Sequence, residues 1–541
     1  MTFSKDNLAI AALAACITLL VFLRALGGDF VNLDDLIFVK NNPYIRHLNG
    51  ELLAWAFSVR ALDLLIPFTW ISFALDYRLW GLNPHGFHLT NVLLHVANTA
   101  LVALIAAELA SGMPVGLADN DGQTRQRKLR LRIALLAALF FGIHPLRVES
   151  VAWITERKDV LNGLFSLASV YCYLLYSGKK MTTGGGGREY LLSLILFSCS
   201  LLAKPVSVGL PLLFLVLDWY PLQRVRLVGL RTTAREKAPF FVISIAIGLL
   251  TIFLFSQKNL LIGLAKLSLV DRCLLSGNAL FEYCRLLLFP VGILPYYELP
   301  DAIGISYLWK SLAVIAFTIV SLLLARRWRW LLAGWLCFLL PVIPVLAFLQ
   351  NNGVAFAARY TYLPSIAPAM VAAFGIAVLL DSLEGEMRIF RNAAVLALFL
   401  LMLFYCGMTY RLTGVWHDTE SLWTRVIELN PDTNKYMDRG VYYSINGRPE
   451  AAAADFSSAI GWLARSGKAP DHNAYAFRGL AEFDLQMYED AVADFSTALA
   501  IKPHPTYYYY RGLALQALGM SEEAEIDFEL AGPNPPPIDT F

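Results

Sequence analysis

Apolar runs long enough to cross a lipid bilayer recur through the first 410 residues. We place about eleven of them, at 8–26, 89–111, 131–143, 160–177, 190–203, 206–218, 239–256, 306–325, 331–349, 363–381 and 392–410. A spanning helix needs about twenty apolar residues. Only 16% of all residues are charged, against about 25% in soluble domains. The sequence therefore predicts an all-α, polytopic membrane protein of about eleven spans, the first of them an uncleaved helix.

Basic residues between the spans predict the orientation. They cluster at 125–130, 179–188, 224–237, 326–329 and 388–391. With eleven spans, all five clusters fall on the side of the N-terminus, which the positive-inside rule assigns to the cytoplasm. The loops 27–88, 144–158 and 257–305 are then extracytoplasmic. Gly and Pro interrupt the last of these, and we expect it to form helices lying on the outer leaflet.

The composition changes after Tyr410 to a polar, repetitive pattern, so we divide the chain into a membrane domain (1–410) and a repeat domain (411–541). Three near-copies each begin at a glycine and place a phenylalanine sixteen residues later: Gly440 and Phe456, Gly479 and Phe495, Gly512 and Phe528. The last two copies are 33 residues apart, close to the period of about 34 of tetratricopeptide repeats. The pattern predicts an α-solenoid of about three repeats, preceded by a half-repeat at SLWTRVIELNP.

Two adjacent acids follow the first span, Asp34 and Asp35 in FVNLDDLIFVKNNPY. Asp34 at the start of a short surface helix could simply cap it. We favour a functional role, because acidic groups beside a bilayer usually mark a site. One carboxylate can then act as a base while the other holds the geometry or a cation. We predict no metal site, since the seven cysteines lack metal-type spacing. If a divalent cation assists, Asp34 and Asp35 are its first candidates.

The second outer loop, HPLRVESVAWITERK, offers further candidates. Glu149 is placed to face the first-loop acids across a cavity. His144 suits a structural turn as well as a functional role. Arg157 and Lys158 are either interface anchors or ligands of an anionic headgroup. Asp159, in the same segment, and His88, ahead of the second span, are further supporting candidates.

Two cations near other spans suit a phosphate. Arg359 precedes Tyr360 in NNGVAFAARYTYLPS, and its planar guanidinium matches phosphate geometry. The alternative is an arginine that only reaches toward the membrane surface. Lys204, in LLAKPVSVGLP, is an isolated cation at membrane depth and needs a partner or an anionic ligand.

Taken in order, these motifs resemble a known family. DDLIFVKNNPYI, GLNPHGFHLTNVLLHVAN, HPLRVESVAWITERKDVLNGLF, LLAKPVSVGLP and ARYTYLPS, followed by the repeats, resemble the transmembrane O-mannosyltransferases with tetratricopeptide repeats and their bacterial relatives. These are similar to GT-C glycosyltransferases. The resemblance implies an extracytoplasmic active site, a polyprenyl-phosphate sugar donor, no further cofactor and a hydroxyl acceptor, commonly on a protein.

The resemblance also assigns roles to residues. It places the catalytic acids at Asp34, Asp35 and Glu149, an R-x-D element at Arg157 and Asp159, and the phosphate-binding motif at Arg359 and Tyr360. Two features depart from the family: Ala358 stands where relatives often carry an acid, and the repeat array is short. The acceptor class of the animal proteins is therefore not carried over.

We interpret the chain as a membrane glycosyltransferase that moves mannose or another hexose to a Ser/Thr hydroxyl by inverting displacement. The site and repeats would face the periplasm of a bacterial inner membrane, and the repeats would bind a protein acceptor or partner; no nucleic acid is expected. One alternative is an en-bloc glycan ligase or polymerase with a lipid-diphosphate donor. Another is a non-catalytic scaffold that recruits partners through its repeats. A transporter is disfavoured because the sequence shows no matched pair of broken helices.

Overall fold

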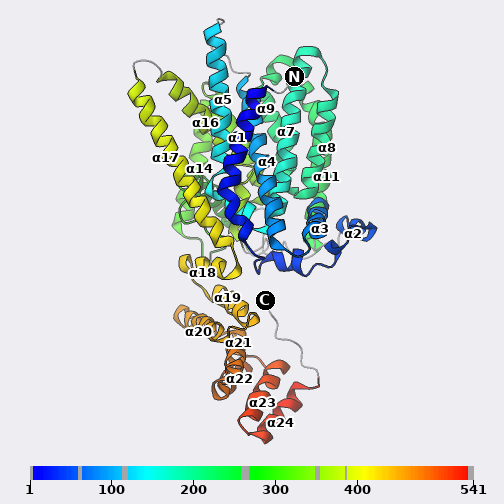
Figure 1. Ribbon diagram of the computed structural model, residues 1–541, viewed down its shortest axis with the longest axis vertical. Coiled ribbons are helices and arrows are strands. Elements are labelled where there is room, and N and C mark those ends of the chain that lie inside the picture. Colours follow the sequence, from blue (N-terminus) through cyan, green and yellow to red (C-terminus); the bar gives the residue numbers. More distant parts are fainter. Residues whose placement is uncertain are drawn as a thin grey trace. The chain divides into compact units, whose positions relative to one another are not determined.

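Helices form nearly all of the regular structure in the computed structural model (Figure 1), which describes residues 4–58, 64–111, 120–257, 267–295, 297–300, 302–347, 354–383 and 387–533. Within these residues the strands are β1 (Tyr297–Glu298) and β2 (Val354–Phe356), which pair antiparallel. The all-α prediction is confirmed. The chain divides into two compact units, Met1–His417 and Asp418–Phe541.

The apolar helices of the first unit have two length classes. Six described segments are long and apolar enough to cross a membrane: Lys5–Gly27 (α1 and η1), Pro84–Ser111 (α4), Ile154–Thr183 (η5 and α7), Leu230–Gln257 (α11), Ile305–Arg326 (α14 and η7) and Arg388–Trp416 (α17 and η10). A seventh candidate is broken, because α5 (Asn120–Gly142) and the segment Pro145–Ala152 (η4 and α6) meet at 54°. Shorter apolar helices occupy Pro205–Trp219 (η6 and α9), Arg329–Val345 (α15 and η8) and Ile366–Ser382 (α16).

Each of the eleven predicted runs falls mainly on a helix. The predicted run 190–203 corresponds to α8 (Gly187–Ala203). Residues 348 and 349 of the predicted run 331–349 lie outside the described residues. By length and composition, six or seven segments of the described chain qualify as spans. The full count of eleven therefore stays a prediction.

The basic clusters and the candidate residues lie at opposite ends of the first unit. Arg127 pairs with Asp6 at 2.6 Å and Arg125 with Asp381 at 2.7 Å, so this cluster lies beside the N-terminus and the end of α16. Helix α7 (Arg157–Thr183) begins among the candidate residues and runs to the next basic cluster. Its 27 residues extend about 40 Å at 1.5 Å per residue.

An aromatic core fixes the loop 27–88 on the bundle. Short helical segments η2 (Leu36–Lys40), η3 (Tyr44–Arg46) and α2 (Gly50–Ala56) precede α3 (Pro67–Trp80). Phe38, Trp70, Phe73 and Phe87 are buried together, with the Phe38 and Trp70 rings 4.9 Å apart. Figure 1 shows α2 and α3 at the end of this unit opposite the N-terminus. Burial of these large rings holds the segment that carries Asp34 and Asp35.

The predicted surface segment 257–305 contains α13 (Leu269–Leu288), while 258–266, 296 and 301 lie outside the described residues. Ser268 and Asp271 form a reciprocal capping box at its start, which satisfies backbone N–H groups of the first turn. The helix packs against α14 and β2. Whether it lies on a leaflet stays a prediction.

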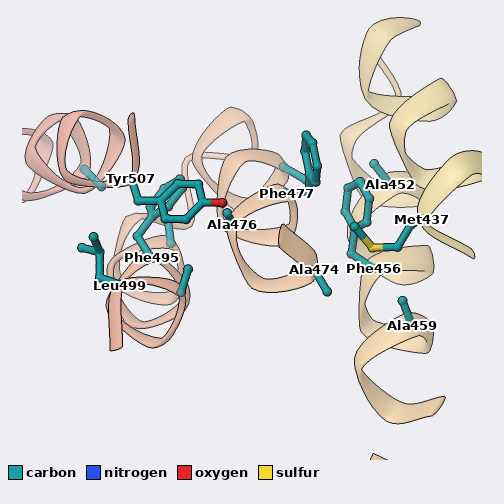
Figure 2. Packing of buried hydrophobic residues seen from close by; sticks show 14 of the residues in the cluster. Met437, Ala452, Phe456, Ala459, Ala474, Ala476, Phe477, Phe495, Leu499 and Tyr507 are labelled. Carbon is teal, nitrogen blue, oxygen red and sulfur yellow. The ribbon is translucent and has the colours of Figure 1, made fainter. Parts of the chain in front are cut away.

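The second unit is a succession of helices, each packed on the next. They are α18 (Thr419–Leu429), α19 (Thr433–Ile445), α20 (Pro449–Ser466), α21 (His472–Asp484), α22 (Tyr488–Ile501), α23 (Pro505–Ala517) and α24 (Ser521–Ala531). Figure 2 shows phenylalanine and alanine side chains packed between neighbouring helices of the stretch from α19 to α23. Phe456 and Phe495 are fully buried, and the Phe456 ring stacks on Phe477 at 5.7 Å.

A polar feature that the sequence reasoning missed repeats in the same register. In each copy the arginine before the glycine forms a two-pronged ion pair with the aspartate before the phenylalanine: Arg439 with Asp455, Arg478 with Asp494 and Arg511 with Asp527. The same arginines also donate to a hydroxyl on the preceding helix, on Thr424, Ser457 and Ser496 respectively. Each arginine therefore joins three helices. In the sequence this ion pair corresponds to the dipeptides Arg-Gly and Asp-Phe, which recur in each copy.

Gly440 allows α19 and α20 to approach closely. A methyl group at this position would lie 2.6 Å from the Phe456 ring, so we expect Gly440→Ala to destabilise this helix pair by about 1–3 kcal/mol. Hydrogen exchange of the full chain should then accelerate in α19 and α20. Gly461→Ala, in the same α20, is the matched control: its methyl meets only the end of Arg465 at 3.4 Å, and removal of a helix-interior glycine should be neutral or stabilising. Equal exchange in both variants would contradict the close-approach role.

Candidate functional site

A cavity of about 350 Å³ at the candidate-residue end of the first unit brings together five charged side chains. Asp34, Glu156, Lys158, Lys204 and Arg359 all line it, together with Tyr360. They come from four separate segments of the chain: the residues just before η2 (Leu36–Lys40), the junction of η5 (Ile154–Glu156) with α7, the turn after α8, and η9 (Ala358–Thr361). Distant loops therefore converge on one small space.

Glu156 is the centre of the cluster. Its carboxylate is 1% exposed and contacts three cations: Lys158 at 3.2 Å, Lys204 at 3.1 Å and the Arg359 Nε at 3.3 Å. A buried carboxylate needs such partners, because an unpaired charge in a low-dielectric site is very costly. Glu156 is therefore the carboxylate that all three cations share, and it links them on one side of the cavity.

Two further acids, Glu149 and Asp159, form hydrogen bonds with two of these cations. Glu149, on α6 (Val148–Ala152), accepts hydrogen bonds from both the backbone N–H and the guanidinium of Arg359. Asp159 accepts from the Lys204 ammonium. Neither acid is among the residues lining the cavity with Asp34. Glu149 was predicted to face the first-loop acids, whereas the structure places it as the anchor of Arg359.

The two adjacent aspartates have different surroundings. The Asp34 side chain is 45% exposed, lines the cavity, and lies 3.5 Å from the Lys158 ammonium. Asp35 is 1% exposed and accepts hydrogen bonds from the N–H of Val31 at 3.1 Å and of Thr155 at 2.9 Å, as well as from the Thr155 hydroxyl. Asp34 is therefore accessible from the cavity, while Asp35 ties the loop 27–88 to the segment 144–158.

Burial raises the pKa of Asp35 to about 7, against the opposing effect of the Thr155 and Val31 hydrogen bonds. A carboxyl whose pKa is higher in the folded state makes folding less favourable as the pH rises, here from about 3.9 in the unfolded chain toward 7. We expect the thermal midpoint of the wild type to fall, relative to that of Asp35→Asn, across this range and to show no further relative change above it. Parallel midpoints of the two proteins at all pH values would contradict this.

One side of the same cavity is apolar. Gly248, Ile252 and Phe255 of α11 (Leu230–Gln257) line it, as do Pro344 and Val345 of η8 (Ile343–Val345). A ligand that fits both sides carries an anionic group next to a hydrocarbon portion. Binding sites of this kind combine a mainly apolar wall with a few convergent polar groups.

Three predicted site residues lie elsewhere. Arg157 is fully buried against Asp76 at 2.6 Å and the Phe87 carbonyl at 2.8 Å, and it does not line the cavity. His144 accepts the N–H of Leu146 and contacts the Leu287 carbonyl, and His88 contacts the Asp29 carbonyl.

The R-x-D element fails as a shared site for a geometric reason. Residues two apart on a helix point about 200° away from each other, so Arg157 and Asp159 at the start of α7 face different neighbours. Sequence reasoning also passed over Glu156. The sequence signal for Glu156 was the run of four charged residues ERKD at the start of a helix. In a helix these four side chains point in different directions, so Glu156 and Arg157 can belong to different sites.

No cluster of three or more His, Cys, Asp or Glu side chains suited to a metal ion occurs among the described residues. Asp34 and Asp35, the first candidates for a cation, point into different surroundings, one toward the cavity and one toward Thr155.

Comparisons with known proteins support the family resemblance, although no protein-family model matches the sequence. The chain is 25% identical over 477 residues to protein O-mannosyl-transferase TMTC4 of Mus musculus, covering 79% of this chain and 62% of that protein. It is 23% identical over 473 residues to a protein O-mannosyl-transferase of Caenorhabditis elegans, covering 82% and 61%. It is also 23% identical over 530 residues to TMTC1 of Homo sapiens, covering 87% and 57%. The chain thus spans about three fifths of the length of these relatives.

Proposed function

Because this integral membrane protein is a relative of the protein O-mannosyl-transferases with tetratricopeptide repeats, we propose that it transfers a hexose from a polyprenyl-phosphate donor to a hydroxyl of an extracytoplasmic protein. The observation that carries the proposal is the cavity that joins an accessible carboxylate, three cations and an apolar wall. A sugar phosphate attached to a long hydrocarbon chain matches these three parts. The sugar would lie between Asp34 and the cations.

The proposed reaction is a single displacement at the anomeric carbon. The Asp34 carboxylate takes the proton of a Ser or Thr hydroxyl as that oxygen bonds to the anomeric carbon. The bond from this carbon to the phosphate oxygen breaks, and the polyprenyl phosphate leaves with the electron pair. One displacement without a covalent enzyme intermediate inverts the anomeric configuration.

The charge that develops on the leaving phosphate would be met by Lys158, Lys204 and Arg359. Their side chains are 12%, 15% and 13% exposed, so little reorganisation is needed to meet the anion. Fixed cations directed at the site where charge develops supply much of the acceleration in many enzymes. Tyr360 would support this group, since the Arg359 guanidinium lies 4.9 Å from its ring centre.

Several finer features belong to the same proposal. The site would open on the extracytoplasmic side, the periplasm if the chain is bacterial, and the full count of spans would be about eleven. The helices of Asp418–Phe541 would form a short tetratricopeptide solenoid whose concave face presents the acceptor or a partner protein.

The direct test is transfer from labelled polyprenyl monophosphate mannose by purified full-length protein in lipid nanodiscs, with a pool of Thr-containing peptides as acceptors. We expect labelled peptide whose anomeric configuration is opposite to that of the donor, and free polyprenyl phosphate in equal amount. Other hexoses on the same carrier form the second arm. Turnover restricted to a lipid-diphosphate donor would favour the glycan-ligase alternative. If the protein turns over neither monophosphate nor diphosphate donors, the proposal that it is a glycosyltransferase is wrong.

A further inference from the structure

A second cavity, of about 550 Å³, lies beside the first-loop segment that carries Asp34. Its lining includes Ile37, Asn41, Tyr44, Glu51, Trp55 and Ser58. Tyr44 and Trp55 stack face to face, with ring centres 4.6 Å apart and planes 7° apart. We call it the Tyr44–Trp55 groove. None of its lining residues belongs to the charged cavity.

The groove is held in shape by buried neighbours. Trp55 packs against the fully buried Trp70 at 5.2 Å. The amide of Asn42 donates to the Phe38 carbonyl and accepts the N–H of Tyr44, both at 3.1 Å. Asn49 caps α2 by accepting the N–H of Leu52 at 3.0 Å. A rigid, pre-formed surface loses little entropy when a ligand binds.

The groove adjoins the proposed base along the chain. Ile37, at its edge, is 57% exposed and follows Asp34 by about one helical turn, a rise of roughly 5 Å. The same short segment therefore borders the charged cavity through Asp34 and the groove through Ile37. A polypeptide lying in the groove could therefore bring a neighbouring Ser or Thr side chain to Asp34.

The chemistry of the lining favours a polypeptide. Among the described residues that line the groove, Glu51 is the one charged side chain, so these residues offer an anionic lipid headgroup or a phosphate no counter-charge. Aromatic faces bind apolar side chains, while the Asn41 amide and Glu51 carboxylate suit backbone N–H groups and basic side chains. We propose that the Tyr44–Trp55 groove binds the acceptor polypeptide next to its modified Ser or Thr. This inference rests on the proposed function.

The first test uses Trp55→Ala in full-length protein, with polyprenyl phosphate mannose and a peptide pool that has a fixed central Thr. Loss of a buried aromatic contact of this kind costs binding roughly thirtyfold. We expect the KM for the peptide to rise by about that factor, while the KM for the donor changes much less. Leu53→Ala is the matched control, since Leu53 lies on the same α2, is 49% exposed and does not line the groove.

The second test changes specificity rather than strength. Glu51→Lys reverses the charge of the groove at an exposed position. Exposed ion pairs change affinity by up to about fivefold, so we expect the preference among flanking residues to shift from Lys and Arg in the wild type toward Asp and Glu in the variant. A purely structural role for Glu51 would not move this preference.

The outcomes distinguish a failure of this inference from a failure of the proposed function. If the wild type neither transfers nor hydrolyses any donor, the proposed function itself fails. If donor turnover is intact but no peptide is accepted, if Trp55→Ala keeps the wild-type peptide KM, or if Glu51→Lys keeps the wild-type preference, the groove is not an acceptor site. A larger loss with Leu53→Ala than with Trp55→Ala would point to a membrane contact and would also overturn the proposal.

Discussion

Asp34→Asn is expected to lower the rate of sugar transfer by about a hundredfold to ten-thousandfold, the usual contribution of a positioned general base. The amide keeps the shape of the side chain but cannot accept the proton of the attacking hydroxyl. Since Asp34 is 45% exposed and, among the described residues, its ion pair is with Lys158 at 3.5 Å, the fold should tolerate the change. The measurement is the initial rate with saturating donor and acceptor, together with the thermal midpoint.

Asp35→Asn provides the comparison at the neighbouring position. Asp35 is buried and bonded to Thr155 and Val31, so its replacement should act mainly on the pH dependence of stability and less on turnover. Transfer lost with Asp35→Asn but kept with Asp34→Asn, at equal stability, would exchange the two roles. Full activity of both variants would remove the catalytic assignment of the acid pair.

Glu156→Gln is expected to destabilise the protein by about 3–5 kcal/mol, because it leaves three neighbouring cations without their shared carboxylate. The same change should lower the KM for the donor, since Lys158, Lys204 and Arg359 lose an internal competitor for the phosphate. A lower thermal midpoint combined with tighter donor binding is a signature that simple loss of packing would not give.

Glu189→Gln is the matched substitution in an ordinary surface pair. Glu189 contacts Lys179 at 2.5 Å, with side chains 16% and 37% exposed, and ion pairs at the surface contribute little to stability because water and salt screen them. We expect a small change in midpoint and an unchanged donor KM. If Glu156→Gln is as mild as Glu189→Gln, the cation cluster does not depend on Glu156.

The sequence was informative wherever a pattern repeats or a charge interrupts an apolar stretch. The apolar runs predicted helices because burial in lipid leaves a chain few alternatives. Asp34, Lys204 and Arg359 were singled out as charges beside a membrane, with a helix cap as the alternative for Asp34 and a surface-reaching arginine for Arg359, and all three line one cavity. These three residues of the candidate site could therefore be predicted from the local sequence alone.

The remaining site depended on contacts between distant segments. Glu149 meets Arg359 across 210 positions of the chain, and Asp35 meets Thr155 across 120; nothing in local spacing selects such partners. Arg157 was misplaced because a motif read along the chain ignores the direction in which each helical side chain points. Asp76, its actual partner, lies 81 positions away.

The arginine of each repeat in the second unit bonds to the aspartate of its own copy and to a hydroxyl of the copy before. Every junction is therefore made by the same chemical parts, and a copy can be added or lost without designing a new interface. Each added copy would then contribute one more junction of the same kind. In such an array the stability of the domain grows roughly in proportion to the number of junctions, while its length grows by one helix pair per copy.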